Sequence, residues 1–94
     1  MKVIVNLHAE QDLEAAEDYY NSEKPGLGLE FLLEFFDAVE EIKNNPEVWK
    51  ETDNQTRRYL MSRFPFQVVY INHEKLIEII AVAHFKRKFK YWKR

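Results

Sequence analysis

The chain has 94 residues, of which 46% are hydrophobic and 15% are aromatic, and it contains no cysteine. These values predict one compact domain over residues 1–94 and exclude a disulfide framework, a thiolate zinc site and a cysteine nucleophile. The net charge of −2 hides a split, because residues 1–50 carry four Lys against twelve acids (−8) and residues 51–94 carry ten Lys or Arg against four acids (+6). Such a split indicates either an internal neutralising contact or two binding faces of opposite charge.

The first half of the chain reads as one strand followed by two helices. Residues 3–7 are rich in β-branched side chains and predict an opening strand. Apolar residues then recur at spacings of three and four over residues 9–21 and again over residues 29–44, which predicts two amphipathic helices. The Pro- and Gly-containing segment 22–28 joins them, and Asn44-Asn45-Pro46 ends the second helix.

The second half of the chain reads as a loop followed by three strands. Residues 46–56 are mostly polar and predict the loop, and the strand-like runs cover residues 58–64, 66–72 and 76–84. Pro65 and the turn-forming segment 72–75 separate these runs, so we expect consecutive antiparallel strands. The predicted fold is α+β: a small antiparallel sheet in the order β-α-α-β-β-β, with an αα-hairpin packed on one face and the first strand at the edge or centre of the sheet.

The carboxy terminus has the strongest local pattern in the sequence. Six of the last nine residues are basic, and aromatic residues alternate with them. Cations bind phosphates and aromatic rings stack on bases, so this pattern is typical of a nucleic-acid or target-binding surface, although the rings equally suit packing on the sheet. The candidate binding residues are Arg57, Arg58, Lys86, Lys88, Lys90, Trp92 and Arg94.

A second hypothesis concerns catalysis at the end of the last strand. An antiparallel meander would bring the arginines near residues 57–63 toward His84 and Arg87. Metal-independent RNA cleavage needs a base, an acid and cations that stabilise the phosphorane. The candidate catalytic residues are Arg63, His84, Arg87 and Tyr91, although a strand-end histidine is more often a structural one.

The sequence contains no pattern that calls for a cofactor or a metal. His8, His73 and His84 lack metal-ligand spacing, and Gly26-Leu27-Gly28 lacks the strand and the Lys-Ser/Thr of a phosphate loop, so an interhelix turn is expected there. No apolar run approaches the length of a membrane span, and the absence of cysteine fits a reducing compartment. We therefore expect a cytoplasmic protein with no cofactor, no metal and no membrane partner.

Short motifs in a fixed order connect the whole chain to one family. They are Ala9-x-x-Asp12-Leu13, Tyr19-Tyr20, Gly26-Leu27-Gly28-x-x-Phe31, Ile42-x-x-x-Pro46, Arg57-Arg58, Arg63-Phe64-Pro65-Phe66-x-x-x-Tyr70 and Ile79-x-Ala81-Val82-x-His84-x-x-Arg87-x-x-x-Tyr91-Trp92-x-Arg94. Together they resemble the RelE/ParE superfamily of toxins from bacterial type II toxin-antitoxin pairs, and the ParE or plasmid-stabilisation branch most of all. The fold of that family is a small antiparallel sheet carrying a helical hairpin, which agrees with the order of elements given above.

The resemblance implies a growth-inhibiting toxin that a cognate antitoxin neutralises by wrapping over it and folding on binding. Some members of the superfamily cut mRNA at the ribosome, and others inhibit DNA gyrase. Many members carry an Arg directly after the aromatic that corresponds to Phe66, but this chain has Gln67, which supplies no permanent cation. We therefore favour inhibition of gyrase over cleavage of mRNA by a metal-independent endoribonuclease. The remaining candidate catalytic residues still allow RNA cleavage.

Other readings stay open at the level of sequence. The chain could be a non-toxic nucleic-acid-binding module or a degenerate toxin that acts as a regulator. Its assembly could be a homodimer or a toxin-antitoxin hetero-oligomer. The acids Glu30, Glu34, Asp37 and Glu41 fit a solvated helix face or an acidic contact surface.

Overall fold

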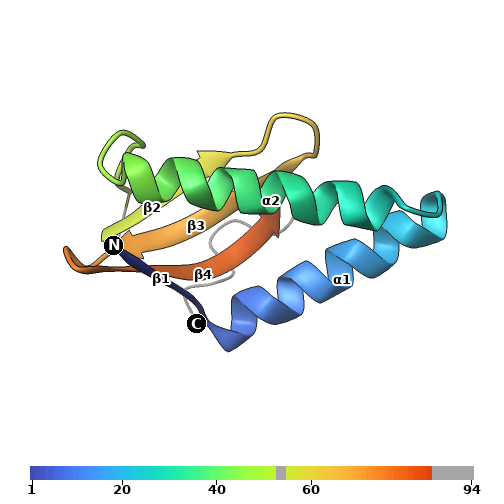
Figure 1. Cartoon of the computed structure of the whole chain (residues 1–94), viewed down its shortest axis with the longest axis horizontal. Helices are drawn as coiled ribbons and strands as arrows, with labels where there is room; N and C mark the ends of the chain where they lie inside the picture. Colours follow the sequence, from blue (N-terminus) through green and yellow to red (C-terminus); the bar gives the residue numbers. More distant parts are fainter. Residues whose placement is uncertain (53–54, 86–94) are drawn as a thin grey trace.

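A computed structural model describes residues 1–52 and 55–85 and contains two helices and four strands (Figure 1). The elements in chain order are β1 (Lys2–Val5), α1 (Leu7–Glu23), α2 (Leu27–Asn44), β2 (Thr56–Leu60), β3 (Phe66–Asn72) and β4 (Leu76–His84). The predicted α+β class and order of elements are thus confirmed. The bounds of β3 and β4 and the end of α2 agree with the sequence-based expectation, whereas β2 lies earlier than the predicted run 58–64.

The helical hairpin begins and turns where local chemistry requires it. Asn6 has extended backbone, and its side-chain oxygen accepts a hydrogen bond from the Ala9 amide at 2.9 Å, so α1 starts at Leu7 rather than Ala9. In the interhelix turn Gly26 has a φ of 90°, a conformation that favours glycine. A Cβ on Gly28 would lie 2.6 Å from the Glu17 carbonyl oxygen, so Gly28 permits the close approach of the two helices.

The strand order in the sheet is β1-β4-β3-β2. The pairs β2–β3 and β3–β4 are antiparallel as expected, but β1 pairs with β4 in parallel, which corrects the expectation of a wholly antiparallel sheet. The reason lies in the hairpin, because α1 continues in the direction of β1 and α2 brings the chain back to the end where β1 starts (Figure 1). Strands β2 and β4 therefore run the same way as β1, and the sheet is mixed.

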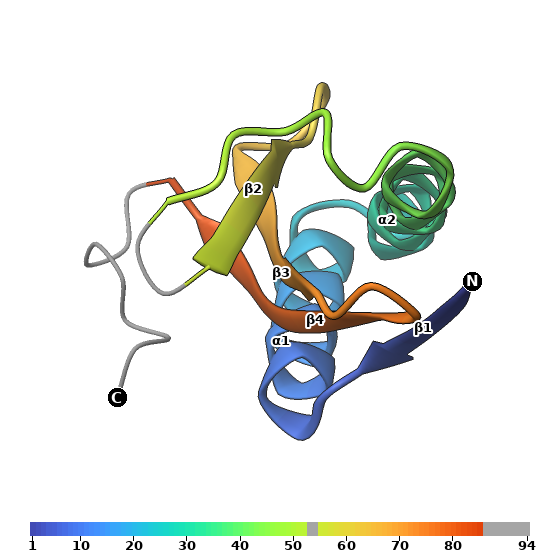
Figure 2. The same cartoon turned by 90° about the vertical axis from the view of Figure 1, so that its left-hand side faces the viewer.

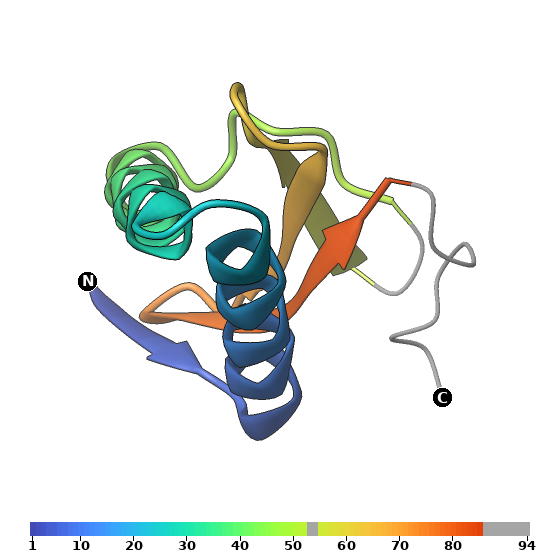
Figure 3. The same cartoon turned by 90° about the vertical axis from the view of Figure 1, so that its right-hand side faces the viewer.

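Both helices lie on one face of the sheet (Figures 2 and 3), and the core lies between the helices and the sheet. The buried apolar side chains of α2 pack with every second residue of β3, and the Phe31 ring meets the rings of Phe64 and Phe66 edge to face, with centroids 5.1 and 5.0 Å away. The members of this core are Ala9, Ala16, Phe31, Phe35, Ala38, Ile42, Met61, Phe64, Phe66, Val68, Tyr70, Ile77, Ile79 and Val82. By strand alternation Gln67 and Val69 point to the opposite face, which carries no helix within the described residues.

A bulge in β4 changes which of its residues face the helices. Val69 pairs with Ala81 and Tyr70 pairs with Ile79, so Ile80 is an extra residue on β4. Before this point Ile77 and Ile79 belong to the core, and after it Val82 does. The shift of one residue therefore turns Ala81 and Ala83 away from the helices.

Helix α1 contacts both sides of this bulge. Asp12, which is 7% exposed, accepts a hydrogen bond from the Val82 amide through Oδ2 at 2.9 Å. His8 Nδ1 lies 3.3 Å from the Ile80 carbonyl oxygen, and His8 Nε2 lies 3.9 Å from Asp12 Oδ1. A buried carboxylate and a histidine one turn apart thus hold the irregular strand against the helix.

Replacing Asp12 with Ala should destabilise the fold because it leaves the buried Val82 amide without its acceptor. We expect a loss of about 2–3 kcal/mol in the free energy of unfolding. Urea denaturation of Asp12→Ala, with Asp18→Ala as the exposed control on the same helix, measures this loss. Equal stabilities of the two variants would contradict the role given to Asp12.

The Tyr59 hydroxyl donates a hydrogen bond to Glu41, and burial together with this carboxylate raises the pKa of Tyr59 to about 12. The phenol ionises near pH 10 in an unfolded chain, so the folded state holds this proton more tightly than the unfolded state does. The stability that the protonated Tyr59 hydroxyl contributes is therefore complete below about pH 10 and is lost as the pH rises through about 12. A tyrosinate absorbance titration of the wild type minus Tyr59→Phe should show this late ionisation. A difference curve centred near pH 10 would contradict it.

Candidate functional site

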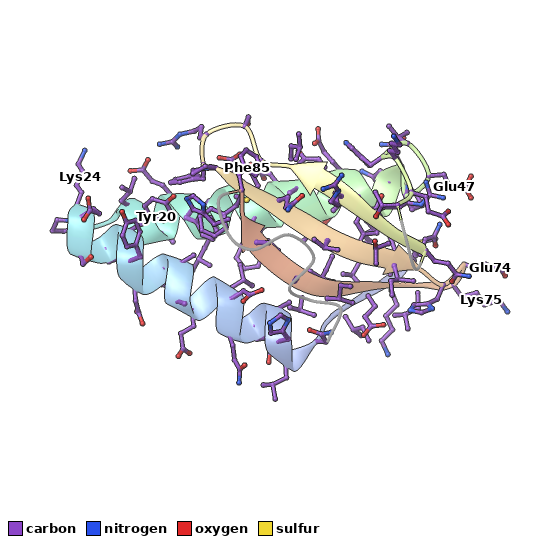
Figure 4. The ribbon with its side chains drawn as sticks, turned by 180° about the vertical axis from the view of Figure 1, so that it is seen from behind. Tyr20, Lys24, Glu47, Glu74, Lys75 and Phe85 are labelled. Atoms are coloured by element: carbon purple, nitrogen blue, oxygen red, sulfur yellow. The ribbon has the colours of Figure 1, made fainter. Side chains whose placement is uncertain are left out.

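A groove lies on the face of the sheet that carries no helix in the described part of the chain. Its lining residues are Trp49, Lys50, Arg58, Leu60, Gln67 and Phe85. The register explains the set, because Leu60 pairs with Gln67 and Gln67 pairs with Ala83, so residues on the same side of β2, β3 and β4 come together. Phe85 follows at the end of β4 (Figure 4) and is held there by a 2.9 Å hydrogen bond from its amide to the Pro65 carbonyl oxygen.

The groove combines apolar surface with two cations. Leu60 and Phe85 are exposed, at 62% and 49%, while Gln67 is 8% exposed and lies in the floor. Lys50 and Arg58 are the lining cations among residues 1–52 and 55–85. A volume of about 550 Å³ is in the range of sites that take a peptide side chain or a nucleotide-sized group.

Arg57 serves a different purpose from its neighbour Arg58. Its guanidinium donates to the carbonyl oxygens of Glu47 and Trp49, at 3.3 and 2.8 Å, and pairs with the Glu51 carboxylate at 3.3 Å. These contacts fasten the segment between α2 and β2 to the edge of the sheet. Arg57 thus lies in a structural contact, and of the two arginines it is Arg58 that lines the groove.

Arg63 lies beside α2 and not beside the end of β4. Its guanidinium is 2.7 Å from Glu30 Oε1, and its amide donates to the Glu34 carboxylate at 3.1 Å. This cation holds the pKa of Glu30 below its usual range. We expected the antiparallel meander to bring Arg63 close to His84. In the described residues, however, the two side chains line different pockets.

His84 lies in a separate pocket on the helix side of the sheet. Because it follows the bulge, it points as Val82 does, and its ring meets Phe66 edge to face with centroids 5.1 Å apart. The pocket is lined by Ala15, Ala16, Tyr19, Tyr20, Pro65, Phe66 and His84. Burial and the neighbouring Tyr19 raise the pKa of Tyr20, so this phenol stays a neutral hydrogen-bond donor and acceptor at neutral pH.

Several predicted residues are outside the described structure, and others were missed by the sequence analysis. Lys86, Arg87, Lys88, Lys90, Tyr91, Trp92 and Arg94 lie outside the described residues. Trp49 was noted as an aromatic that suits either an interface or core packing, and it both lines the groove and packs against the core. Lys50 and Leu60 line the groove but were not singled out, since their segments have no pattern that indicates where they pack. The adjacent Tyr19-Tyr20 motif was noted, but its position beside His84 depends on the bulge.

Neither a metal centre nor a membrane span is found in the described ranges. Residues 1–52 and 55–85 contain no group of three or more His, Cys, Asp or Glu side chains that is arranged to hold a metal ion. Neither described helix combines the length and the apolar character needed to cross a membrane. Within these ranges, the chemistry available to the groove is that of its cations, its amide and its apolar surface.

Comparison with known proteins connects this geometry to a family. Among solved structures the fold is similar to a chain of the chromosomal ParDE toxin-antitoxin system from P. aeruginosa, with a TM-score of 0.79 and 20% sequence identity over 89% of this chain and 95% of that one. A search of curated proteins gives no match. Residues 3–89 match the family model described as the ParE toxin of the type II toxin-antitoxin system parDE. The chain therefore belongs to the ParE toxin family of type II toxin-antitoxin systems.

Proposed function

We propose that this chain arrests growth in the cytoplasm by binding and inhibiting DNA gyrase, and that a cognate antitoxin neutralises it. Membership of the ParE family supplies the class of protein. The observation that favours docking over RNA cleavage is the composition of the groove. Within the described residues its lining contains no histidine, carboxylate or tyrosine.

This composition matters because RNA cleavage without a metal requires proton transfer at both the attacking and the leaving oxygen. His84 is turned to the helix side, and the floor position next to Phe66 is the neutral Gln67. The apolar rim of Leu60 and Phe85 with Lys50 and Arg58 beside it instead suits a protein surface that presents apolar groups and acids. Docking alone then inhibits the target.

The order in which macromolecular synthesis stops tests the target. Induced expression without antitoxin, followed by pulse labelling of DNA, RNA and protein in the same cells, should show DNA synthesis falling first. Purified protein should inhibit gyrase supercoiling in vitro. Early loss of protein synthesis with cut mRNA would instead assign the activity to RNA cleavage, and normal growth would leave the non-toxic nucleic-acid-binding module as the better reading.

Two substitutions separate docking from catalysis. Arg58→Ala removes a groove cation and should weaken gyrase inhibition by about tenfold, whereas Lys75→Ala, in the turn between β3 and β4 (Figure 4), should not. His84→Gln should leave growth arrest largely intact because His84 lies outside the groove. A loss of two orders of magnitude or more in His84→Gln, with the fold retained, would make the histidine catalytic and contradict the proposal.

A further inference from the structure

Helix α2 has an apolar stripe on the side that faces away from the core. Leu29, Leu33 and Phe36 are spaced by four and three residues and therefore follow one line along the helix. Their exposed fractions are 58%, 54% and 57%. The core-facing side of the same helix is already buried, so this stripe is additional apolar surface that the fold itself does not use.

The stripe lies beside acids that the fold leaves available. Among the five acids of α2, Glu30 pairs with Arg63, Glu34 accepts from the amides of Ser62 and Arg63, and Glu41 accepts from Tyr59. Asp37 and Glu40 form no hydrogen bond or ion pair with another described residue and are exposed. They follow Leu33 and Phe36 by four residues each, so they extend the same face of the helix.

A hollow beside the stripe contains one of its apolar residues, Leu33, and one of these acids, Asp37. It lies between α2 and the loop after β2, has a volume of about 310 Å³ and is lined by Glu30, Leu33, Glu34, Asp37, Ser62 and Arg63. Leu33 supplies an apolar wall, and Asp37 supplies a carboxylate at the rim. This combination suits a Lys or Arg side chain, whose aliphatic stem packs on Leu33 while its charged end reaches Asp37.

Charge decides which occupant fits this surface. Helix α2 carries five acids against one base, so pairing two copies of α2 through the stripe would bring like charges together. We infer that the stripe Leu29-Leu33-Phe36 and its hollow dock a basic amphipathic segment of the antitoxin, with apolar side chains on the stripe and a Lys or Arg in the hollow. This inference rests on the proposed function, in which an antitoxin holds the toxin.

The antitoxin is the occupant we favour because the groove and the stripe with its hollow are separate surfaces that share no lining residue. The groove lies on the face of the sheet that carries no helix in the described residues, whereas the stripe is on the exposed side of α2, which packs on the other face (Figures 2 and 3). A segment that orders on binding can contact two separate surfaces, and the stripe would give it an anchor that does not compete with the target.

The affinity of the purified full-length antitoxin for toxin variants tests this inference. The double variant Leu33→Ser/Phe36→Ser should bind at least tenfold more weakly, since two apolar anchors are removed. Asp37→Asn should weaken binding about two- to fivefold at low salt and less at high salt. Leu7→Ser is the matched control, because Leu7 is 67% exposed on α1 and lies outside the stripe.

Growth arrest by each variant, with and without antitoxin, separates the possible failures. The double variant should still arrest growth and melt as the wild type does, but should escape neutralisation. Unchanged antitoxin affinity would overturn the inference, as would lost growth arrest with intact antitoxin binding, which would assign the stripe to the target. A self-association of the wild type that the double variant abolishes, at unchanged antitoxin affinity, would assign it to a second copy. If the wild type arrests no growth, the proposed function fails, while the affinity measurement still tests the stripe.

Discussion

The hydrogen bond from the Val82 amide to the buried Asp12 carboxylate fixes the relation between α1 and the last strand, and the candidate sites depend on it. It lies directly after the extra residue Ile80, where β4 changes the face to which its side chains point. Without this bulge, strict alternation would place Ala81, Ala83 and Phe85 against the helices. With it, Val82 enters the core, His84 reaches the tyrosine pocket, and Phe85 reaches the groove.

The separation of His84 from the groove is thus a property of strand register. A residue one position away along the chain lies on the other side of the sheet, so closeness in sequence at the end of β4 does not place His84 and Phe85 in one site. Arg63 is separated further, because Glu30 and Glu34 hold it and its loop against α2. Among the described residues, an acid-base pair and a phosphate-binding cation do not converge in one pocket, while a groove with apolar surface and two cations does form.

Sequence patterns predicted the elements well where apolar periodicity and breakers coincide. Pro46 follows the end of α2, and β3 and β4 extend over the predicted residues because Pro65 and the turn at 72–75 separate them. The predicted run 58–64 extends past the end of β2 because tertiary contacts determine where that strand stops. Glu34 accepts hydrogen bonds from the amides of Ser62 and Arg63, so these two residues form a loop instead of continuing the strand. The parallel pairing of β1 with β4 could not be predicted from the local sequence either, since a strand of four residues does not indicate which strand it pairs with.

The site was less predictable than the fold because one of its determinants, the bulge in β4, has no signal in the sequence. Residues 79–83 are all apolar, so nothing marks the extra residue of the bulge, and alternation cannot be assigned to a face there. The charge split was visible, and its first interpretation, an internal neutralising contact, is confirmed in part, whereas two binding faces of opposite charge stay a prediction. Arg63 neutralises an acid internally, whereas Arg58 lines the groove and Asp37 remains at the surface. Opposite charges therefore hold the loop after β2 against α2, and the remaining charges place cations in the groove and a carboxylate in the hollow beside α2.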